Sequence, residues 1–269
     1  MQKSTITILA FVLTLGISIF SCAATDSPEG DSAKRPADAL HDGFTLQPLK
    51  FEVQHPYDLK LEERYSYDKA TNTHDLWVLD TDKPHMPPPN KTEPRTEIRI
   101  EDSDYKPGSG LHMMDCDMYI TPGTFACISQ VFGTGPMCII IVDKDGTITD
   151  LRTHDVIAKD MNDKWFNWTI IHDPDAVGPG AIKVYIDGKL ATDKIEATKQ
   201  ASFYFKVGVY SRKDSNRNEV KVRNLQYLIK PSSGSTTRIN IENFRFKTWV
   251  SSVVAGRLNN GTFGAISCL

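Results

Sequence analysis

The chain has 269 residues, and 31 Lys and Arg against 34 Asp and Glu give a formal net charge of −3 at pH 7. This near balance excludes the basic surface that binds a phosphate backbone, so no nucleic acid is expected as a partner. No apolar run reaches the ~20 residues that a membrane helix needs, which excludes a transmembrane segment.

Residues 1–24 have the order of a secretory signal peptide. A short positive start precedes an apolar run over Ile6–Phe20, and small residues follow it. A bacterial lipobox ending at Cys22 is the second interpretation, because Phe20 fits that motif poorly. We therefore expect a secreted or extracellular protein, with the cell wall and the vacuole as further destinations.

The rest of the chain divides by composition. Residues 25–42 are rich in Ser, Asp, Pro and Ala and predict a flexible leader. Residues 43–230 have the texture of one all-β domain, and residues 231–269 form a C-terminal extension of unassigned role. Ile239 and Ile241 alternate with polar neighbours there, which predicts one further strand.

Short runs of β-branched and aromatic residues, separated by turn residues, fill the central domain. Asp145–Gly146 and Asp187–Gly188 are dipeptides typical of hairpin turns. Ile182, Val184 and Ile186 alternate with polar neighbours, and no amphipathic helix longer than a few turns is present. The pattern predicts an all-β jelly roll or concanavalin-like sandwich.

After removal of the signal peptide, four cysteines remain. They permit disulfides in three connectivities, between which the sequence does not choose, and buried free thiols are the alternative for the two in apolar strands. The four are Cys116, Cys127, Cys138 and Cys268, of which Cys127 and Cys138 lie in the apolar strands. Three sequons predict N-glycosylation in an organism that glycosylates: Asn90, Asn167 and Asn260.

One predicted strand, residues 94–100, alternates two arginines and a glutamate with apolar residues. Strand geometry puts Arg95, Glu97 and Arg99 on one face. Because guanidinium groups suit carboxylates, this face predicts an anion-binding platform, and a solvated face of alternating charges is the alternative.

Two later strands add polar side chains by the same parity. Gln130 is the single hydrogen-bonding side chain on its face of residues 127–133. In residues 203–210, Tyr204, Lys206 and Tyr210 share a face around Gly208, while the other face is apolar. The glycine is expected to leave room for a ligand near the backbone.

These strands resemble the signature strands of polysaccharide lyase family 7, the alginate lyases, and resemble the plant citrate-binding-protein group more closely still. The similarity spans roughly residues 44–230. The stretches that carry it, in order, are Pro56–Asp58, Glu63–Tyr67, Asp82–His85, Pro94–Ile100, Gln130–Gly133, Asp163–Phe166, Ile171–Asp173, Val184–Gly188 and Tyr204–Tyr210.

The resemblance implies cleavage of a uronate polymer by β-elimination, in which the substrate carboxylate is neutralised, a base removes a proton and an acid protonates the leaving group. It implies catalytic roles for Tyr210, Gln130 and Arg95. It also implies that Glu97, Arg99, Lys206 and Tyr204 contact the substrate. No metal and no cofactor are predicted.

One motif residue departs from the family. The lyases carry Gln-x-His where this chain has Gln130-Val131-Phe132. His85 is then the candidate catalytic imidazole from a neighbouring loop, with a structural loop residue as its alternative. His172 is expected to bond locally, to Asp173 or the backbone.

Two functions follow. One is a secreted lyase acting on an alginate- or glucuronan-type polymer. The other is a non-catalytic protein that binds citrate or an acidic oligosaccharide through the same cleft. A purely structural cell-wall protein, the third possibility, leaves the polar strand faces unexplained.

Overall fold

The computed structural model describes residues 35–101 and 104–232. The predicted signal peptide, most of the predicted leader and the extension after residue 232, with its predicted strand, lie outside the described residues. Within the described part, no helix has the length and apolar character needed to cross a membrane.

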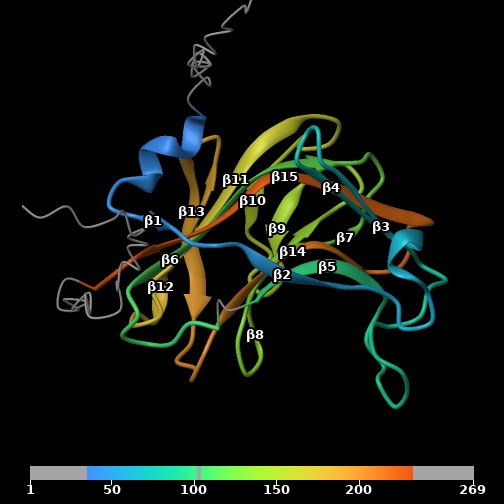
Figure 1. Cartoon of the computed structure of the whole chain (residues 1–269), viewed down its shortest axis with the longest axis horizontal. Coiled ribbons are helices and arrows are strands. Elements are labelled where there is room, and N and C mark those ends of the chain that lie inside the picture. The colour runs from blue at the N-terminus through green and yellow to red at the C-terminus, as the bar shows by residue number, and fades with distance from the viewer. Residues whose placement is uncertain (1–34, 102–103, 233–269) are drawn as a thin grey trace, which may run out of the picture.

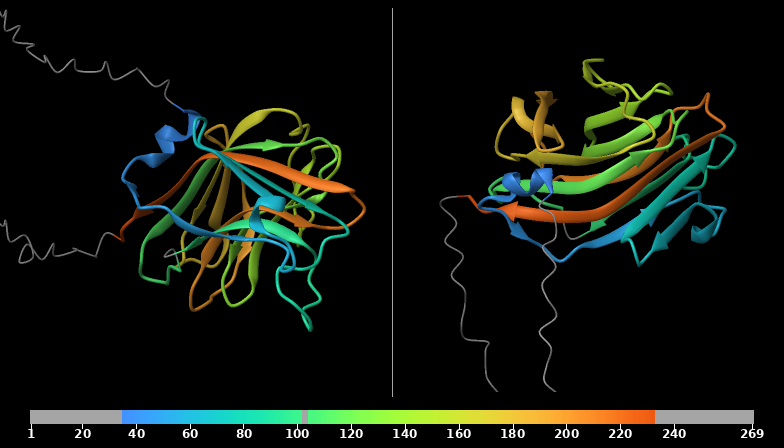
Figure 2. Two further views of the ribbon diagram at one scale, coloured as in Figure 1. Left: turned by 45° about the vertical axis from the view of Figure 1, so that its right-hand side comes forward. Right: turned by 90° about the horizontal axis from the view of Figure 1, so that it is seen from above.

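Two curved antiparallel sheets pack face to face as a β-jelly roll (Figure 1, Figure 2), which confirms the predicted all-β fold. The eight-stranded sheet contains β1 (Thr45–Leu46), β3 (Tyr65–Asp68), β4 (Thr73–Leu79), β6 (Leu111–Ile120), β11 (Trp165–His172), β12 (Gly178–Ile186), β13 (Lys189–Ala197) and β15 (Arg217–Lys230). The seven-stranded sheet contains β2 (Lys50–Gln54), β5 (Arg95–Glu101), β7 (Ala126–Phe132), β8 (Pro136–Val142), β9 (Ile148–Asp150), β10 (Val156–Ala158) and β14 (Tyr204–Ser211). The only helices among the described residues are two short 3-10 helices, η1 (Pro36–His41) and η2 (Leu61–Glu63).

The core lies between the sheets and is built by strand alternation. On β5, Ile98 and Ile100 point inward and are fully buried, and on β14 Val207 and Val209 do the same. Because successive side chains of a strand point to opposite faces, the polar partners of these residues are carried to the outer face of the seven-stranded sheet.

Both predicted hairpins are confirmed. Asp187 and Gly188 form a two-residue turn between β12 and β13, with φ values of 49° and 72°. Two consecutive positive φ values define the tight turn that Asp-Gly favours. Asp145 and Gly146 lie in the loop that joins the paired strands β8 and β9.

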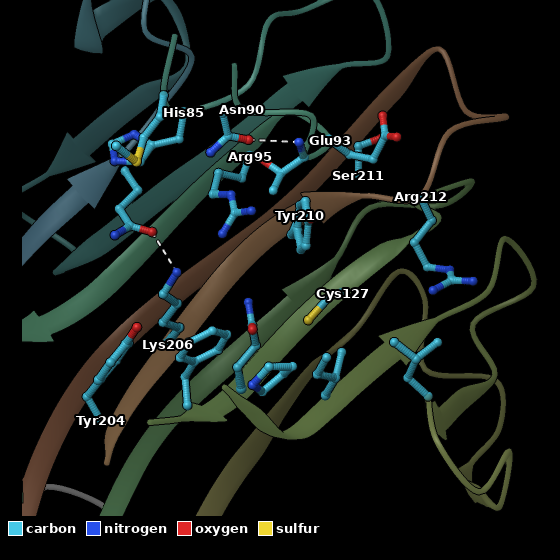
Figure 3. A pocket seen from close by; sticks show the side chains of 18 residues that line it. His85, Asn90, Glu93, Arg95, Cys127, Tyr204, Lys206, Tyr210, Ser211 and Arg212 are labelled. Carbon is cyan, nitrogen blue, oxygen red and sulfur yellow. Dashed lines mark hydrogen bonds between the residues drawn. The ribbon is translucent and has the colours of Figure 1, made fainter. Parts of the chain in front are cut away.

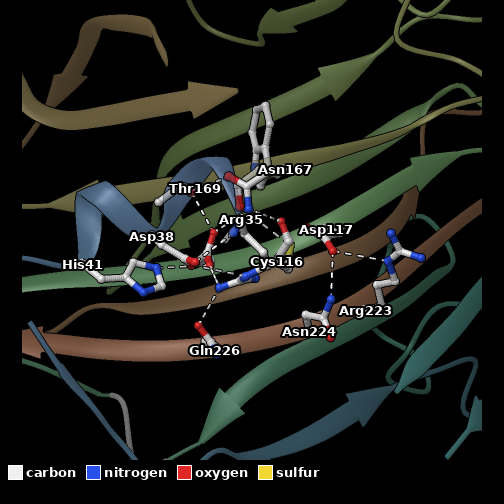
Figure 4. Close-up of polar contacts among 12 residues, drawn as sticks. Arg35, Asp38, His41, Cys116, Asp117, Asn167, Thr169, Arg223, Asn224 and Gln226 are labelled. Atoms are coloured by element: carbon white, nitrogen blue, oxygen red, sulfur yellow. Dashed lines mark hydrogen bonds and ion pairs between the residues drawn. The ribbon is translucent and has the colours of Figure 1, made fainter. Parts of the chain in front are cut away.

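The predicted flexible leader is ordered at its end. Residues 36–41 form η1, and the preceding Arg35 donates to Oδ2 of Asp115 at 2.6 Å on the outer face of the eight-stranded sheet (Figure 4). Asp115 is 0% exposed, and its Oδ1 accepts from Asn167 and Thr169, each at 2.8 Å. Charge pairing therefore holds residues 35–41 against the sheet. The composition of the segment alone does not reveal this.

His172 does not make the expected local bond. It is fully buried, and its Nδ1 lies 2.8 Å from the hydroxyl of Tyr105. The reason is strand parity: His172 ends β11 with its side chain between the sheets, where Tyr105 and Phe203 surround it. Burial, together with a smaller effect of nearby His112, lowers the pKa of His172 to about 3.

The described cysteines are free thiols. Cys116, Cys127 and Cys138 are buried and unbridged, so the thiol alternative holds for Cys127 and Cys138. Cys268 lies outside the described residues, as does the sequon at Asn260. The sequon at Asn167 is not usable in the folded chain, because its amide is buried and bonded to Asp115.

Candidate functional site

Three neighbouring strands of the seven-stranded sheet carry the predicted site residues. The strand order runs β8-β7-β14-β5-β2. Tyr210 on β14 is opposite Arg95 on β5 and Cys127 on β7, and Lys206 is opposite Gln130. Parity and register therefore bring these side chains together on the outer face.

A cavity of about 650 Å³ opens over these strands (Figure 3), and we call it the sheet cavity. Its 18 lining residues come from β2, β5, β7, β8 and β14 and from the loops beside them. Six of the residues predicted from the sequence line it: His85, Arg95, Gln130, Tyr204, Lys206 and Tyr210.

Glu97 does not line the sheet cavity but organises its floor. Its carboxylate is 0% exposed and accepts from the amide nitrogen of Gln130, from Arg95 at 3.3 Å and from Lys206 at 3.4 Å. Lys206 also donates to Gln54 Oε1 at 2.6 Å. Burial lowers the pKa of Lys206, and the negative charge of Glu97 opposes this. Glu97 therefore acts as the internal counterion of the site.

Arg95 is a cation of the site with a hydrogen-bond donor that has no partner among the described residues. Its guanidinium lies over the Tyr210 ring, 3.9 Å from the ring centroid. Its Nε is buried and has no hydrogen-bond partner among the described residues. Because a buried unpaired donor is unfavourable, a ligand oxygen that accepts from Arg95 would be stabilised.

Arg99, for which the resemblance implies a substrate contact, is not among the residues that line the sheet cavity. Its Nη2 donates to Asp104 at 2.7 Å, and its guanidinium lies 4.2 Å from the centroid of Tyr204. Asp104 follows β5 by three residues, so the next loop supplies the partner of Arg99. Parity gives the face of a side chain but not its partner.

Phe132 stands at the end of β7, at the position to which the resemblance assigns the motif histidine. Its ring is 5.5 Å from that of Tyr204, and the Lys206 ammonium is 5.7 Å from its centroid. The ring faces the sheet cavity and adds apolar surface there. It supplies neither a proton acceptor nor a hydrogen-bond donor.

His85 lies in the loop between β4 and β5 and lines the sheet cavity (Figure 3). Its Nδ1 donates to the carbonyl oxygen of His55 at 3.0 Å. A carbonyl only accepts, so Nδ1 carries the hydrogen and Nε2 of the neutral ring is an acceptor.

Gly208 serves the sheet rather than a ligand. Its φ is +148°, and a Cβ placed there would lie 2.5 Å from the carbonyl oxygen of Thr96 and 2.7 Å from Cα of Glu97. The expectation that it opens space for a ligand is therefore wrong. A side chain at this position would collide with β5 instead.

Several lining residues carry no sequence signal that identifies them. Gln54, Arg212 and Glu93 reach the sheet cavity from β2 and from loops. Pro136, Ile139 and Leu151 line it from β8 and from the residue after β9. Strand pairing brings these residues to the site, and a lone polar or apolar residue in a strand does not reveal its neighbours.

The fold and the site together define a jelly roll of the alginate lyase type. The solved structure of the alginate lyase AlgAT5 from polysaccharide lyase family 7 superposes with a TM-score of 0.51 at 17% identity, covering 66% of this chain and 93% of that one. The alginate lyase from Corynebacterium sp. gives 0.50 at 18% identity, covering 63% and 82%. At these identities the likeness shows the fold.

Sequence comparison assigns the family. The family model described as Alginate lyase matches residues 46–229, so the chain belongs to this family. A citrate-binding protein from Hevea brasiliensis is 35% identical over 188 residues, which cover 68% of this chain and 75% of that protein. The resemblance predicted from the strand motifs is thereby confirmed.

Proposed function

We propose that this protein binds an acidic ligand through a carboxylate group in the sheet cavity. The observation that carries the proposal is Arg95, whose guanidinium lines the cavity while its buried Nε has no partner among the described residues. A guanidinium binds a carboxylate through charge-assisted hydrogen bonds. The citrate-binding relative, a protein named for a carboxylate ligand, supports the proposal.

Binding without turnover fits the residues better than catalysis does. β-Elimination needs a group that neutralises the substrate carboxylate and a base that removes the proton. Phe132 fills the position of the motif histidine, and Gln130 and Lys206 are already bonded to Glu97. Arg95 retains a buried donor with no partner among the described residues, which suffices for binding.

The proposal is tested by calorimetric titration with citrate and with an alginate-derived oligouronate. Arg95→Ala is expected to weaken binding by one to two orders of magnitude, because a hydrogen bond to a charged group contributes about 1.5–3 kcal/mol. Arg217→Ala is the matched control, because Arg217 lies over the Trp77 ring outside the sheet cavity. Unchanged affinity in a folded Arg95 variant would refute the proposal.

A uronate lyase is the second candidate, and the position of Tyr210 favours it. Its ring lines the sheet cavity, and the Arg95 guanidinium lies 3.9 Å from the ring centroid, so its hydroxyl stands beside the proposed carboxylate site. His85 Nε2 offers a second acceptor on the cavity wall. Tyr210 would then act as base and acid on an alginate- or glucuronan-type polymer, with Gln130 and Arg95 neutralising the substrate carboxylate.

The two candidates differ in product. The lyase releases an unsaturated sugar that absorbs in the far ultraviolet, so alginate, glucuronan and pectate are each incubated with the wild type and with Tyr210→Phe. A lyase loses its product in the variant and keeps its binding, since only a hydroxyl is removed. A wild type that forms no product but binds as the variant does leaves binding as the function.

We also propose that the protein is secreted. The order of residues 1–24 supports this, being that of a signal peptide. Sequencing the N-terminus of the mature protein tests it. A start near residue 25 is expected, and an intact Met1 would contradict secretion by this route.

A further inference from the structure

The lining of the sheet cavity changes from charged to apolar across the strands. Lys206 on β14 is opposite Gln130 on β7, which is opposite Ile139 on β8. Two residues further along these strands, Tyr204 is opposite Phe132, which is opposite Pro136. Of the charged lining residues, Arg95 and Lys206 come from β5 and β14, and Glu93 lies just before β5. Arg212 follows β14 and stands over Phe125, at the end of β7 away from Phe132.

The opposite wall, which we call the apolar wall, carries no charge. It consists of Phe132, Pro136, Ile139 and Leu151, and Leu151 is held beside β8 by a backbone bond to Ile139 at 2.9 Å. No charged side chain from β7, β8 or β9 is among the described residues that line the cavity. The sheet cavity therefore has a cationic end and an apolar end.

A uronate ring fits the apolar wall poorly. It carries hydroxyl groups around its edge, and each of them loses water on entering the cavity. Ile139, Leu151 and Pro136 offer these hydroxyls no side-chain donor or acceptor. A hydroxyl that is desolvated without a hydrogen bond is unfavourable, whereas an apolar ring at the same place is stabilised by leaving water.

The spacing sets the length of the ligand. The Arg95 guanidinium lies over Tyr210 and thus stands above β14. Phe132 is one strand from β14, and Ile139 is two strands away. The Lys206 ammonium connects the two ends: it lies 5.7 Å from the Phe132 centroid and 3.4 Å from the Glu97 oxygen that Arg95 contacts at 3.3 Å. The guanidinium is therefore within about 12 Å of the Phe132 ring. A ring joined to a carboxylate by a short chain has this reach.

We propose that the ligand of the sheet cavity is a carboxylate with an apolar, ring-sized body. Its carboxylate binds Arg95, and its body packs on Phe132, Ile139 and Leu151. The inference rests on the proposed carboxylate binding and adds the chemical class of the ligand. The cavity volume of about 650 Å³ exceeds what a small hydroxy acid occupies and is typical of sites for ring-containing ligands.

Calorimetric titration with four compounds tests the inference: 3-phenylpropionate, its uncharged amide, glucuronate and citrate. Wild type is expected to bind 3-phenylpropionate about tenfold or more tightly than glucuronate, from the apolar area that the ring buries. The amide, which lacks the charge, is expected to bind about tenfold or more weakly than the acid.

Two variants locate the apolar contact. Ile139→Thr keeps a β-branched residue in β8 and is expected to lower affinity for 3-phenylpropionate about threefold to tenfold, and to lower it more than affinity for citrate, which has no apolar ring. Val156→Thr is the matched control, because Val156 lies exposed on β10 and does not line the cavity. Circular dichroism checks that both variants fold.

The outcomes separate the two proposals. If citrate or glucuronate binds as tightly as 3-phenylpropionate, and Arg95→Ala abolishes that binding, the apolar ligand class is wrong while carboxylate binding stands. If Ile139→Thr and Val156→Thr weaken 3-phenylpropionate equally, the apolar wall is not the contact. If no carboxylate binds, both proposals are wrong.

Discussion

At the scale of single residues, Glu97 and Arg95 share one buried network but have different parts in it. Glu97 is a fully buried carboxylate whose three donors come from three different strands. It neutralises the positive charges of the floor in the absence of ligand. Arg95 contacts this network through one nitrogen, and its buried Nε has no partner among the described residues. The first residue holds the site together and the second is placed to bind.

Glu97→Gln tests this division. The amide has the same shape, but it leaves Lys206 and Arg95 without their buried counterion. We expect the free energy of unfolding to fall by about 3 kcal/mol, the cost typical of breaking a buried pair on one side. Urea denaturation measures it, with Glu101→Gln at the partly exposed end of the same strand as the control. A loss equal in both variants would contradict the role of Glu97.

Strand parity predicted much of the site at this scale. Arg95, Gln130, Lys206 and Tyr210 were assigned to one face, and they line one cavity. Arg99 has the same parity but pairs with Asp104, a loop residue whose position the alternation does not encode. Side-chain direction follows from backbone geometry, whereas side-chain partners follow from tertiary structure.

At the scale of elements, η1 closes over a buried charge on the eight-stranded sheet. Arg35 bonds both Asp115 and Gln226 Oε1, the latter at 2.9 Å, and His41 Nε2 lies 3.2 Å from Asp115. The carbonyl of Pro36 also contacts the turn at Gly188, so the helix lies against the β12–β13 hairpin. The contacts of Arg35 and His41 with Asp115, which we call the charged clamp, and the contact with the turn together order this segment.

Arg35→Ala should therefore destabilise the domain although it lies near the start of the described chain. Asp115 would keep its amide and hydroxyl donors but lose the guanidinium, and an uncompensated buried carboxylate is strongly unfavourable. We expect a loss of about 3 kcal/mol in urea denaturation. Arg35→Lys should restore part of it, because the charge returns without the planar fork. An unchanged unfolding midpoint in Arg35→Ala would show that the clamp does not contribute.

Elements were predicted where the signal is local. Asp187–Gly188 fixes a two-residue turn by backbone conformation alone, and alternation over Ile182–Ile186 reveals β12. The order of η1 depends on Asp115, 80 residues away from Arg35 in sequence. Composition near the N-terminus gives no sign of such a long-range partner.

At the scale of the whole molecule, the interior between the sheets contains neutral histidines. Burial lowers the pKa of His74 and of His112 to about 4, and that of His172 to about 3. His112 bonds the hydroxyl of Tyr227 at 2.6 Å, and its ring stacks on Tyr105 at 3.8 Å. At neutral pH these imidazole rings are therefore uncharged in the folded protein.

Lowering the pH should destabilise the folded protein over a defined pH range. The folded pKa values lie below the ordinary value near 6.5, so the unfolded chain binds more protons between pH 6.5 and about 4. The stabilisation is therefore complete above pH 6.5 and is lost as pH falls, by up to about 1.4 kcal/mol per pH unit for each histidine. Urea denaturation at pH 7, 6 and 5 measures the slope.

His172→Asn isolates one of these contributions. The amide retains a partner for the Tyr105 hydroxyl but does not titrate, so the slope between pH 6.5 and 5 should be smaller than in wild type. A surface variant, His154→Asn, should keep the wild-type slope, because His154 is exposed. A slope unchanged in His172→Asn would mean that this ring is not neutral in the folded protein.

Arg95 is the group proposed to hold the ligand carboxylate, and a crystal structure of the protein with bound 3-phenylpropionate or citrate tests this role most directly. We predict ligand oxygens at about 2.7–2.9 Å from the Arg95 guanidinium, inside the sheet cavity. A ligand bound elsewhere, or one in the cavity whose carboxylate does not touch Arg95, would contradict the account.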